Sequence, residues 1–168
     1  MGYGSNRIVL KCDQEPSIME VQEGVAALRT GETVPRNSPV GSSASNGAVE
    51  NYIKRVEAQI RTMRIDLEAS IGHTIPVGHD IFDWLISWAS TILFRYAING
   101  ETGKTGYQIM AGKKTQRPIA KFGEKVLYKP NKYMERKRSK AEATMKEGFW
   151  MGVSTRSDEA MIGTENGI

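Results

Sequence analysis

The most regular hydrophobic pattern in the chain predicts a long amphipathic helix that begins after Gly47. Apolar residues recur there at alternating steps of four and three positions, at Val49, Ile53, Val56, Ile60, Met63 and Leu67. Such steps keep the apolar side chains on one face of a helix. Gly72 is expected to end this helix, and Pro76 prevents an immediate restart.

Two strands and a helix are predicted ahead of the long helix. Residues 7–12 are apolar and β-branched, which favours a short buried strand. Residues 16–29 predict a helix with a proline in its first turn. A second short strand is expected at residues 33–34, where Pro35 should end it. Residues 36–46 are rich in Ser, Gly and Asn, so a polar loop should follow.

Beyond the long helix, the pattern changes from helices to short strands. Asp80 is placed to cap a helix that should run to about residue 98 and that contains Trp84 and Trp88. A short helix is expected at residues 105–112. Short strands with Gly-rich turns follow at residues 122–128, 148–153 and 159–163. This succession favours a small β-barrel.

Charge is distributed unevenly between the two parts of the chain. Residues 1–100 hold 9 Lys and Arg against 11 Asp and Glu, whereas residues 101–168 hold 14 against 8. The excess is largest in residues 101–146, with 13 basic and 4 acidic side chains. A basic excess of this kind is typical of a surface that meets a polyanion, although a lysine-rich solvated surface would have the same composition.

Several classes of protein are disfavoured by the composition. Cys12 is the single cysteine, so an internal disulfide and a structural Cys/His zinc site are excluded. His73 and His79 are interpreted as turn or surface residues. Residues 1–6 lack the apolar segment of a secretory signal, which predicts an intracellular protein. Polar residues interrupt the apolar stretch 81–98, so a buried helix is favoured over a membrane span.

Two carboxylates are distinguished by their positions. Asp13 follows directly after the first strand, where α/β sheets present ligands and catalytic groups. Glu50 lies in the first turn of the long helix. Each has a simpler explanation, since Asp commonly caps helices and an acid complements the dipole at a helix start. Their separation, which spans a helix, a strand and a polar loop, suggests half of a DDE constellation of catalytic carboxylates.

The segment 38–50 resembles a known family. It contains Ser-Pro, a polar stretch, Asn-Gly and then Glu50. This order is similar to the stretch that carries the catalytic Glu in the integrases of retroviruses and long-terminal-repeat retrotransposons, and most similar to copia-type polyproteins. Asp13 falls where the second catalytic Asp of that family would lie.

Four further stretches are similar to the same family in the same order. Residues 104–107 and 112–114 resemble its "KTPYE…GKKP" segment, except that Gly106 replaces the usual Pro. Residues 122–123 and 148–152 resemble its "VFG" and "IFLGY" strands. Residues 14–16 depart from the family, because Gln-Glu-Pro stands where Asn-Gly is usual.

The resemblance implies an α/β fold of two parts. Residues 1–112 would be the C-terminal part of an RNase H-like integrase core that lacks its first strands. Residues 113–168 would be a small, incomplete, basic β module that is β-barrel-like. The family's zinc-binding region and its first catalytic Asp would lie upstream of this chain, which would make it a fragment of a polyprotein.

The resemblance also implies the chemistry. Integrases process DNA 3′ ends and transfer strands by in-line attack at phosphorus, with two Mg²⁺ (or Mn²⁺) ions that activate the nucleophile and stabilise the leaving oxygen. Asp13 and Glu50 would each help to hold one ion, and the missing first Asp would bridge both. We therefore expect an incomplete two-metal site, and we expect this chain alone to be inactive.

DNA, as element ends and as target, is the expected partner. In the family, the long helix lies along viral DNA ends, although a solvated helix face is the simpler explanation for its basic residues. The residues expected to bind nucleic acid are Asn46, Lys54, Arg61, Arg64, Lys113, Lys114, Arg117, Lys121, Arg136, Lys137 and Arg138.

Two other classes of function stay open on the sequence. One is a basic nucleic-acid-binding module with no catalytic descent, which would explain the charge but not the spacing of the carboxylates. The other is an interaction domain that dimerises through the helix of Trp84 and Trp88, although this helix is expected to be core. A homodimer or higher oligomer is also compatible with an integrase, as is a location in the nucleus or in a cytoplasmic virus-like particle.

Overall fold

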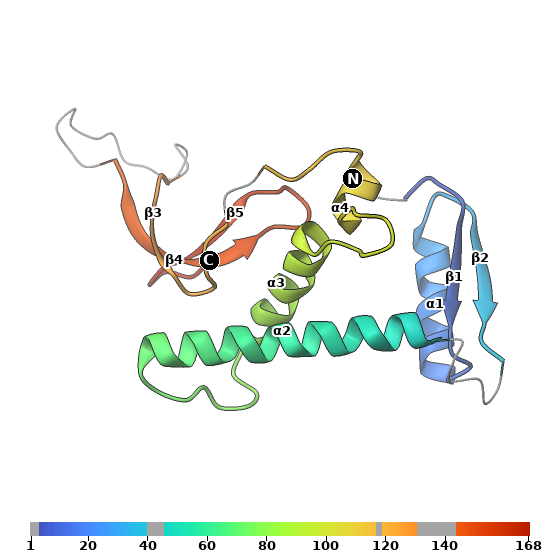
Figure 1. Cartoon of the computed structure of the whole chain (residues 1–168), viewed down its shortest axis with the longest axis horizontal. Coiled ribbons are helices and arrows are strands. Elements are labelled where there is room, and N and C mark those ends of the chain that lie inside the picture. Colours follow the sequence, from blue (N-terminus) through green and yellow to red (C-terminus); the bar gives the residue numbers. More distant parts are fainter. Residues whose placement is uncertain (1–3, 40–45, 117–118, 131–143) are drawn as a thin grey trace. The chain divides into compact units, whose positions relative to one another are not determined.

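The computed structural model describes residues 4–39, 46–116, 119–130 and 144–168 (Figure 1). Within them it has a mixed α/β fold of four helices and two small sheets. The chain divides into two compact units, residues 1–57 (unit 1) and residues 58–168 (unit 2). The expected domain boundary at residues 112 and 113 falls inside unit 2 and stays a prediction. Over the described ranges, no helix is both long enough and apolar enough to cross a membrane.

Unit 1 is a β-α-β arrangement followed by the start of a long helix (Figure 1). Strand β1 (Ile8–Cys12) and strand β2 (Thr33–Asn37) pair in parallel, with Ile8 opposite Thr33. Helix α1 (Pro16–Leu28) connects them, as a parallel pair requires. These elements agree with the predicted pattern, because apolar period and Pro placement are local signals.

Two expectations for the strands of unit 1 are wrong. Strand β1 is not buried: its residues alternate between half-buried and exposed, and Val9 is 58% exposed. Within the described residues, the face of β1 that carries Val9 is not covered by another element. Pro35 does not end β2 but lies within it, opposite Leu10. Proline is tolerated there because an edge strand has one side without ladder bonds.

Helix α2 (Gly47–Ile71) begins and ends where the pattern predicted, and its end is fixed by a loop contact. Glu68 accepts a hydrogen bond from the Arg64 side chain (2.8 Å) and one from the Ile75 backbone N–H (2.8 Å). Arg64 also donates to the Ile75 carbonyl (2.8 Å). This network holds the turn after α2 against the helix.

Helix α3 (Ile81–Tyr96) does not use the predicted cap. The Asp80 side chain makes no capping hydrogen bond, and its backbone is already helical (φ −54°, ψ −20°). Instead the Ile81 N–H donates to His79 Nδ1 (3.1 Å), which places His79 in the turn as expected. Helix α4 (Gly106–Ala111) begins with a reciprocal capping box between Thr105 and Gln108.

The C-terminal strands form one antiparallel sheet in the order β3-β4-β5, at Lys125–Tyr128, Lys146–Val153 and Ala160–Gly163. Within the residues that the structure describes, this sheet is not a closed barrel, so the barrel-like prediction is corrected. A bulge between Trp150 and Gly152 shifts the β4-β5 register. Bulges bend a strand, and a short three-stranded sheet needs no closure to bury one face.

The core of unit 2 lies where α3 packs on β4. Trp88 is 2% exposed and meets the Trp150 ring edge-on, with centroids 6.0 Å apart. Gly152 has φ +114°, and a Cβ there would lie 2.9 Å from the Trp88 ring. Glycine is therefore required for both backbone conformation and close packing. The Trp88 side of α3 is core, as expected.

Candidate functional site

Asp13 lies directly beyond the carboxyl end of β1, and hydrogen bonds on both sides of it lead to Ser38. The Ser38 N–H donates to the Cys12 carbonyl (2.9 Å), which continues the parallel ladder past the end of β2. The Gln14 amide donates to the Ser38 carbonyl (2.9 Å). The backbone around Asp13 is thus attached to the segment that follows β2, while the Asp13 side chain remains exposed.

Ser38 also connects this strand end to the start of helix α2. Its hydroxyl donates to Asn46 Oδ1 (2.6 Å), and Ser38 is only 1% exposed. Asn46 immediately precedes α2, and Glu50 lies four positions later in the first turn. Ser38 thus connects the strand end next to Asp13 with the residue before the helix that carries Glu50. No contact between the two carboxylates is seen among the described residues, and their convergence stays a prediction.

The carboxylates of Asp13 and Glu50 are suitable ligands for a hard cation, but two of them do not make a complete site. Carboxylate oxygens are the ligands that Mg²⁺ prefers, and both Asp13 and Glu50 are exposed enough to be reached. In the part of the chain that the structure describes, no three His, Cys, Asp or Glu side chains gather closely enough to hold a metal ion. The pair could supply some ligands of a metal site, with others from elsewhere or from water.

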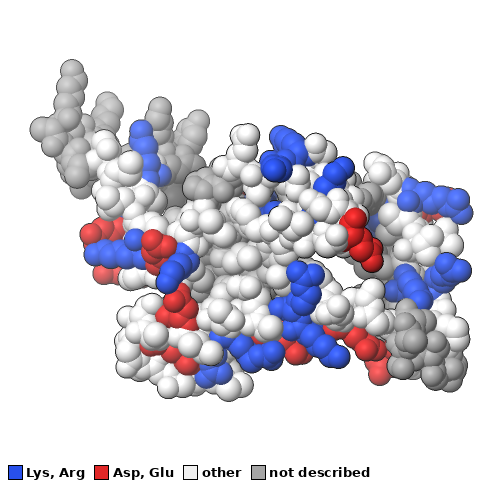
Figure 2. Space-filling view, viewed as in Figure 1, with Lys and Arg blue, Asp and Glu red and all other residues white. Residues whose placement is uncertain are grey.

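The basic residues predicted on α2 and near it have different surroundings. Lys54 is exposed in unit 1, and Arg61 is exposed in unit 2. Arg64 is engaged with Glu68 and Ile75, and its guanidinium lies 5.4 Å from the centre of the Phe82 ring. Lys121 forms an ion pair with Asp66 (3.0 Å). On the visible face in Figure 2, Asp and Glu side chains lie among the Lys and Arg side chains along α2.

The network at Arg64 changes the acidity of one group. The pKa of Glu68 is lowered from its ordinary value of 4.5, first by the hydrogen bond from the Ile75 N–H and then by the hydrogen bond and charge of Arg64. Both partners stabilise the ionised carboxylate. The contacts of Arg64 thus give it a structural role, and its predicted role with nucleic acid stays a prediction.

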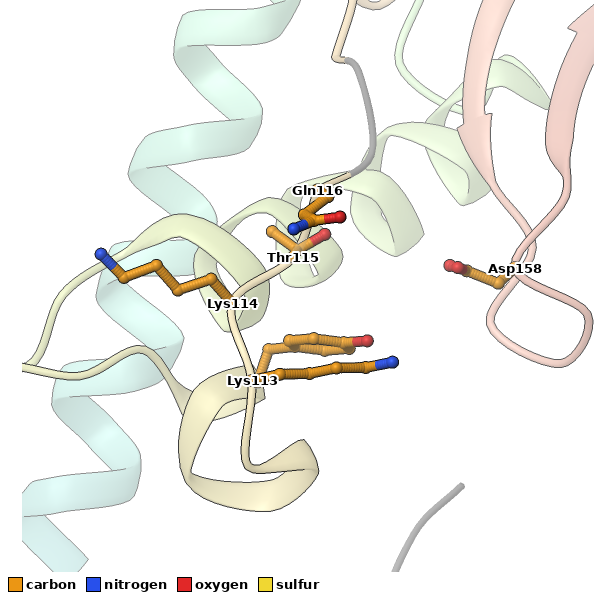
Figure 3. Close-up of a pocket in the computed structure, with 6 residues that line it drawn as sticks. Lys113, Lys114, Thr115, Gln116 and Asp158 are labelled. Carbon is orange, nitrogen blue, oxygen red and sulfur yellow. The ribbon is translucent and has the colours of Figure 1, made fainter.

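Lys113 and Lys114 line a cavity in unit 2 with a volume of about 330 Å³ (Figure 3). Its other lining residues are Tyr107, Thr115, Gln116 and Asp158. A smaller cavity of about 210 Å³ shares Lys114 and Thr115 and is also lined by Arg95. In Figure 3, Lys113 points toward the side on which Asp158 lies, whereas Lys114 points away from it.

Sequence reasoning missed the ion pair that holds Asp158, one of the residues that line this cavity. Arg95 lies within α3 and is buried, and its guanidinium pairs with Asp158 (2.5 Å) from the turn between β4 and β5. The same guanidinium lies 5.5 Å from the centre of the Tyr107 ring. Asp158 adopts a left-handed backbone conformation (φ 61°). A charged residue at a buried helix position was a signal, but the partner 63 positions away could not be read from the pattern.

The remaining predicted residues lie outside the described part of the chain. They are Arg117, Arg136, Lys137 and Arg138. Their roles stay predictions.

Comparisons of this chain with protein-family models, with curated proteins and with solved structures find no match. Its function is therefore inferred from its own residues and their contacts.

Proposed function

We propose that this chain is part of an integrase-like enzyme of a copia-type retrotransposon, which joins DNA strands with the help of divalent metal ions. Unit 1 would contribute the second and third catalytic carboxylates, Asp13 and Glu50. Basic residues on α2 and in unit 2 would contact the phosphates of DNA.

One observation carries this proposal: the contacts of Ser38. A parallel β-α-β unit presents Asp13 at its carboxyl edge. Ser38 bonds to both chain neighbours of Asp13 and, through Asn46, to the start of the helix that bears Glu50. The Ser-Pro and Asn-Gly parts of the family resemblance thus coincide with the two ends of one hydrogen bond. A basic module without catalytic descent would explain the charge but not the spacing of Asp13 and Glu50.

Asp13 and Glu50 would hold divalent ions through their carboxylate oxygens. Bound Mg²⁺ would supply an activated nucleophile and stabilise the leaving oxygen. Two carboxylates are few for an ion that dehydrates reluctantly and demands octahedral geometry, so binding should be weak. We expect the chain alone to show no strand transfer in the presence of Mg²⁺ or Mn²⁺. Joining of DNA ends that is lost in Glu50→Gln would overturn the expectation of inactivity.

The metal site itself can be tested without catalysis. Mn²⁺ broadens the NMR signals of amides near its binding position. Titration into the ¹⁵N-labelled chain should broaden the amides next to Asp13 and those of the first turn of α2 together. Asp13→Asn should remove both effects, and Glu57→Gln, a change of the same type further along α2, should remove neither. Broadening at only one of the two segments would refute the shared site.

The DNA contacts can be tested through their dependence on salt. Affinity for duplex DNA should fall steeply as salt rises, because each phosphate contact releases counterions. Lys54→Gln and Arg61→Gln should each reduce the slope of log affinity against log salt by about 1. Duplex affinity that does not change between low and moderate salt would contradict the electrostatic proposal.

A basic nucleic-acid-binding module without metal chemistry is the second candidate, and the charge of residues 101–146 favours it. The two candidates differ in one outcome. A non-catalytic module should bind DNA with the same salt dependence but show no Mn²⁺ effect that depends on both Asp13 and Glu50.

A further inference from the structure

We propose that the larger cavity of unit 2 binds one nucleotide unit of a single-stranded nucleic acid, with a phosphate at Lys113 and the base against Tyr107. This inference rests on the proposed function and specifies the strand that unit 2 would hold. It concerns a place in the molecule separate from Asp13 and Glu50, since all the lining residues lie in unit 2.

The size of the cavity suits a single unit of a polymer. Its volume of about 330 Å³ lies at the lower end of the range of ligand pockets, roughly 300–1,000 Å³. A duplex would rest on the rim of such a recess, because its bases are paired and stacked inside the helix. A base can enter only when it is unstacked, as in a single strand.

The charge of the cavity favours a phosphate. Lys113 and Lys114 bring two positive charges. The one acidic lining residue, Asp158, is already paired with Arg95, so its charge does not cancel those of the lysines. Lys113 points toward the side on which Asp158 lies, whereas Lys114 points away and also lines the smaller cavity (Figure 3). Lys113 is therefore the cation best placed to meet a phosphate inside.

The Tyr107 ring is held in place by two neighbouring side chains. Phe94 meets the ring edge-on, with centroids 6.2 Å apart. Arg95 lies over the ring and lines the smaller cavity, whereas Tyr107 lines the larger one. A fixed aromatic ring is thus part of the lining of the larger cavity. Stacking on such a ring accepts any base, because every base has a π-face.

Two neutral side chains complete the lining. Thr115 and Gln116 supply a hydroxyl and an amide, which can both donate and accept hydrogen bonds. Groups of this kind can bind sugar hydroxyls or base edges without requiring one sequence. The cavity therefore combines a cation, an aromatic ring and neutral polar groups, which is the set that sequence-tolerant binding of single strands uses.

The test is the affinity of the full 168-residue chain for a fluorescent dT10 oligonucleotide, measured by anisotropy. Tyr107→Leu removes the ring and should weaken dT10 binding about tenfold, while its matched control Tyr107→Phe should stay within about twofold. Lys113→Gln should weaken binding and reduce the salt slope by about 0.7, the value for one phosphate contact to a single strand. Lys125→Gln, which removes one charge from β3 outside the cavity, should leave dT10 affinity within about twofold.

Several results would overturn the inference. A folded Tyr107→Leu variant that binds dT10 as tightly as the parent chain would do so. If Tyr107→Leu melts early, Lys113→Gln decides, and an unchanged dT10 affinity in that variant refutes the site. Binding of dTMP without binding of dT10 would reassign the cavity to free nucleotides and contradict the strand proposal.

This failure can be told apart from failure of the proposed function. The Mn²⁺ test reads Asp13 and Glu50 in unit 1 and requires neither Tyr107 nor Lys113. A shared Mn²⁺ site with no effect of Tyr107→Leu or Lys113→Gln on dT10 would leave the integrase-like proposal standing and remove only the cavity.

Discussion

The interior of unit 1 and the interior of unit 2 are stabilised by different kinds of contact. In unit 2, the buried side chains are mostly apolar, and they include Leu85, Trp88 and Trp150. Among the described residues of unit 1, the buried side chains are polar: Gln22, which donates to the Leu10 carbonyl (2.6 Å), and Ser38. Apolar residues of unit 1 are instead exposed, with Leu28 at 89%.

Because of this difference, the stability of the chain and the geometry of the candidate site depend on different kinds of interaction. Apolar burial stabilises in proportion to area and has no preferred direction. A hydrogen bond contributes only about 1 kcal/mol net, but it fixes the relative position of two groups. Unit 2 should therefore dominate the stability of the chain. Unit 1 should depend on a few directed bonds, among them those that connect the segments next to Asp13 and Glu50.

The largest expected effect comes from a matched pair of leucines. Leu85→Ala should reduce the free energy of unfolding by about 2–5 kcal/mol, because it opens a cavity at a fully buried position. Leu28→Ala makes the same chemical change at an exposed position and should alter it by less than about 0.5 kcal/mol. Urea unfolding of both variants checks this pair. Equal effects would mean that Leu28 is covered in solution and that the contrast between the units fails.

A smaller effect is expected at the centre of the candidate site. Ser38→Ala removes the hydroxyl that donates to Asn46 and should destabilise unit 1 by about 1 kcal/mol. Amide hydrogen exchange in the first turn of α2 should accelerate, while exchange in α3 stays unchanged. A double-mutant cycle with Asn46→Ala is the control, since the two changes remove the same bond and should not add. Additive effects would show that the bond does not join these segments.

The sequence predicted the elements of both units well but not their long-range polar contacts. Helix α2 follows from the local apolar period, and Asp13 and Glu50 were singled out because of their places beside predicted elements. The role of Ser38 could not be predicted, because its three partners lie 8 to 26 positions away and no periodic pattern encodes them. The pairing of Arg95 with Asp158 escaped prediction for the same reason.

The predictions that the structure contradicts failed for local physical reasons. Pro35 was expected to end a strand, but in a two-stranded sheet both strands are edges, where a missing N–H is tolerated. Asp80 was expected to cap α3, yet its backbone is already helical, and the N–H groups of Phe82 and Asp83 donate to the backbone carbonyls of His79 and Asp80. Closure of β3, β4 and β5 into a barrel could not be judged from strand content alone.

The smallest expected effect is the pH dependence of the stability that Glu68 contributes to unit 2. The pKa of Glu68 is lowered in the folded state from about 4.5, so its contribution to stability is fully present above about 4.5 and is lost as pH falls through the folded pKa. The difference in unfolding free energy between the parent chain and Glu68→Gln should therefore be constant near neutral pH and should shrink on acidification. Arg64→Met should reduce the same dependence. A difference that grows toward acid would contradict this account of the network.

The most direct test of the central claim is the Mn²⁺ affinity of four chains, measured by calorimetry: the parent, Asp13→Asn, Glu50→Gln and the double variant. If the two carboxylates hold an ion jointly, each single substitution should weaken binding nearly as much as both together, because either loss dismantles the same site. If the two losses are independent, or if neither substitution changes the affinity, then residues 13 and 50 do not form one site.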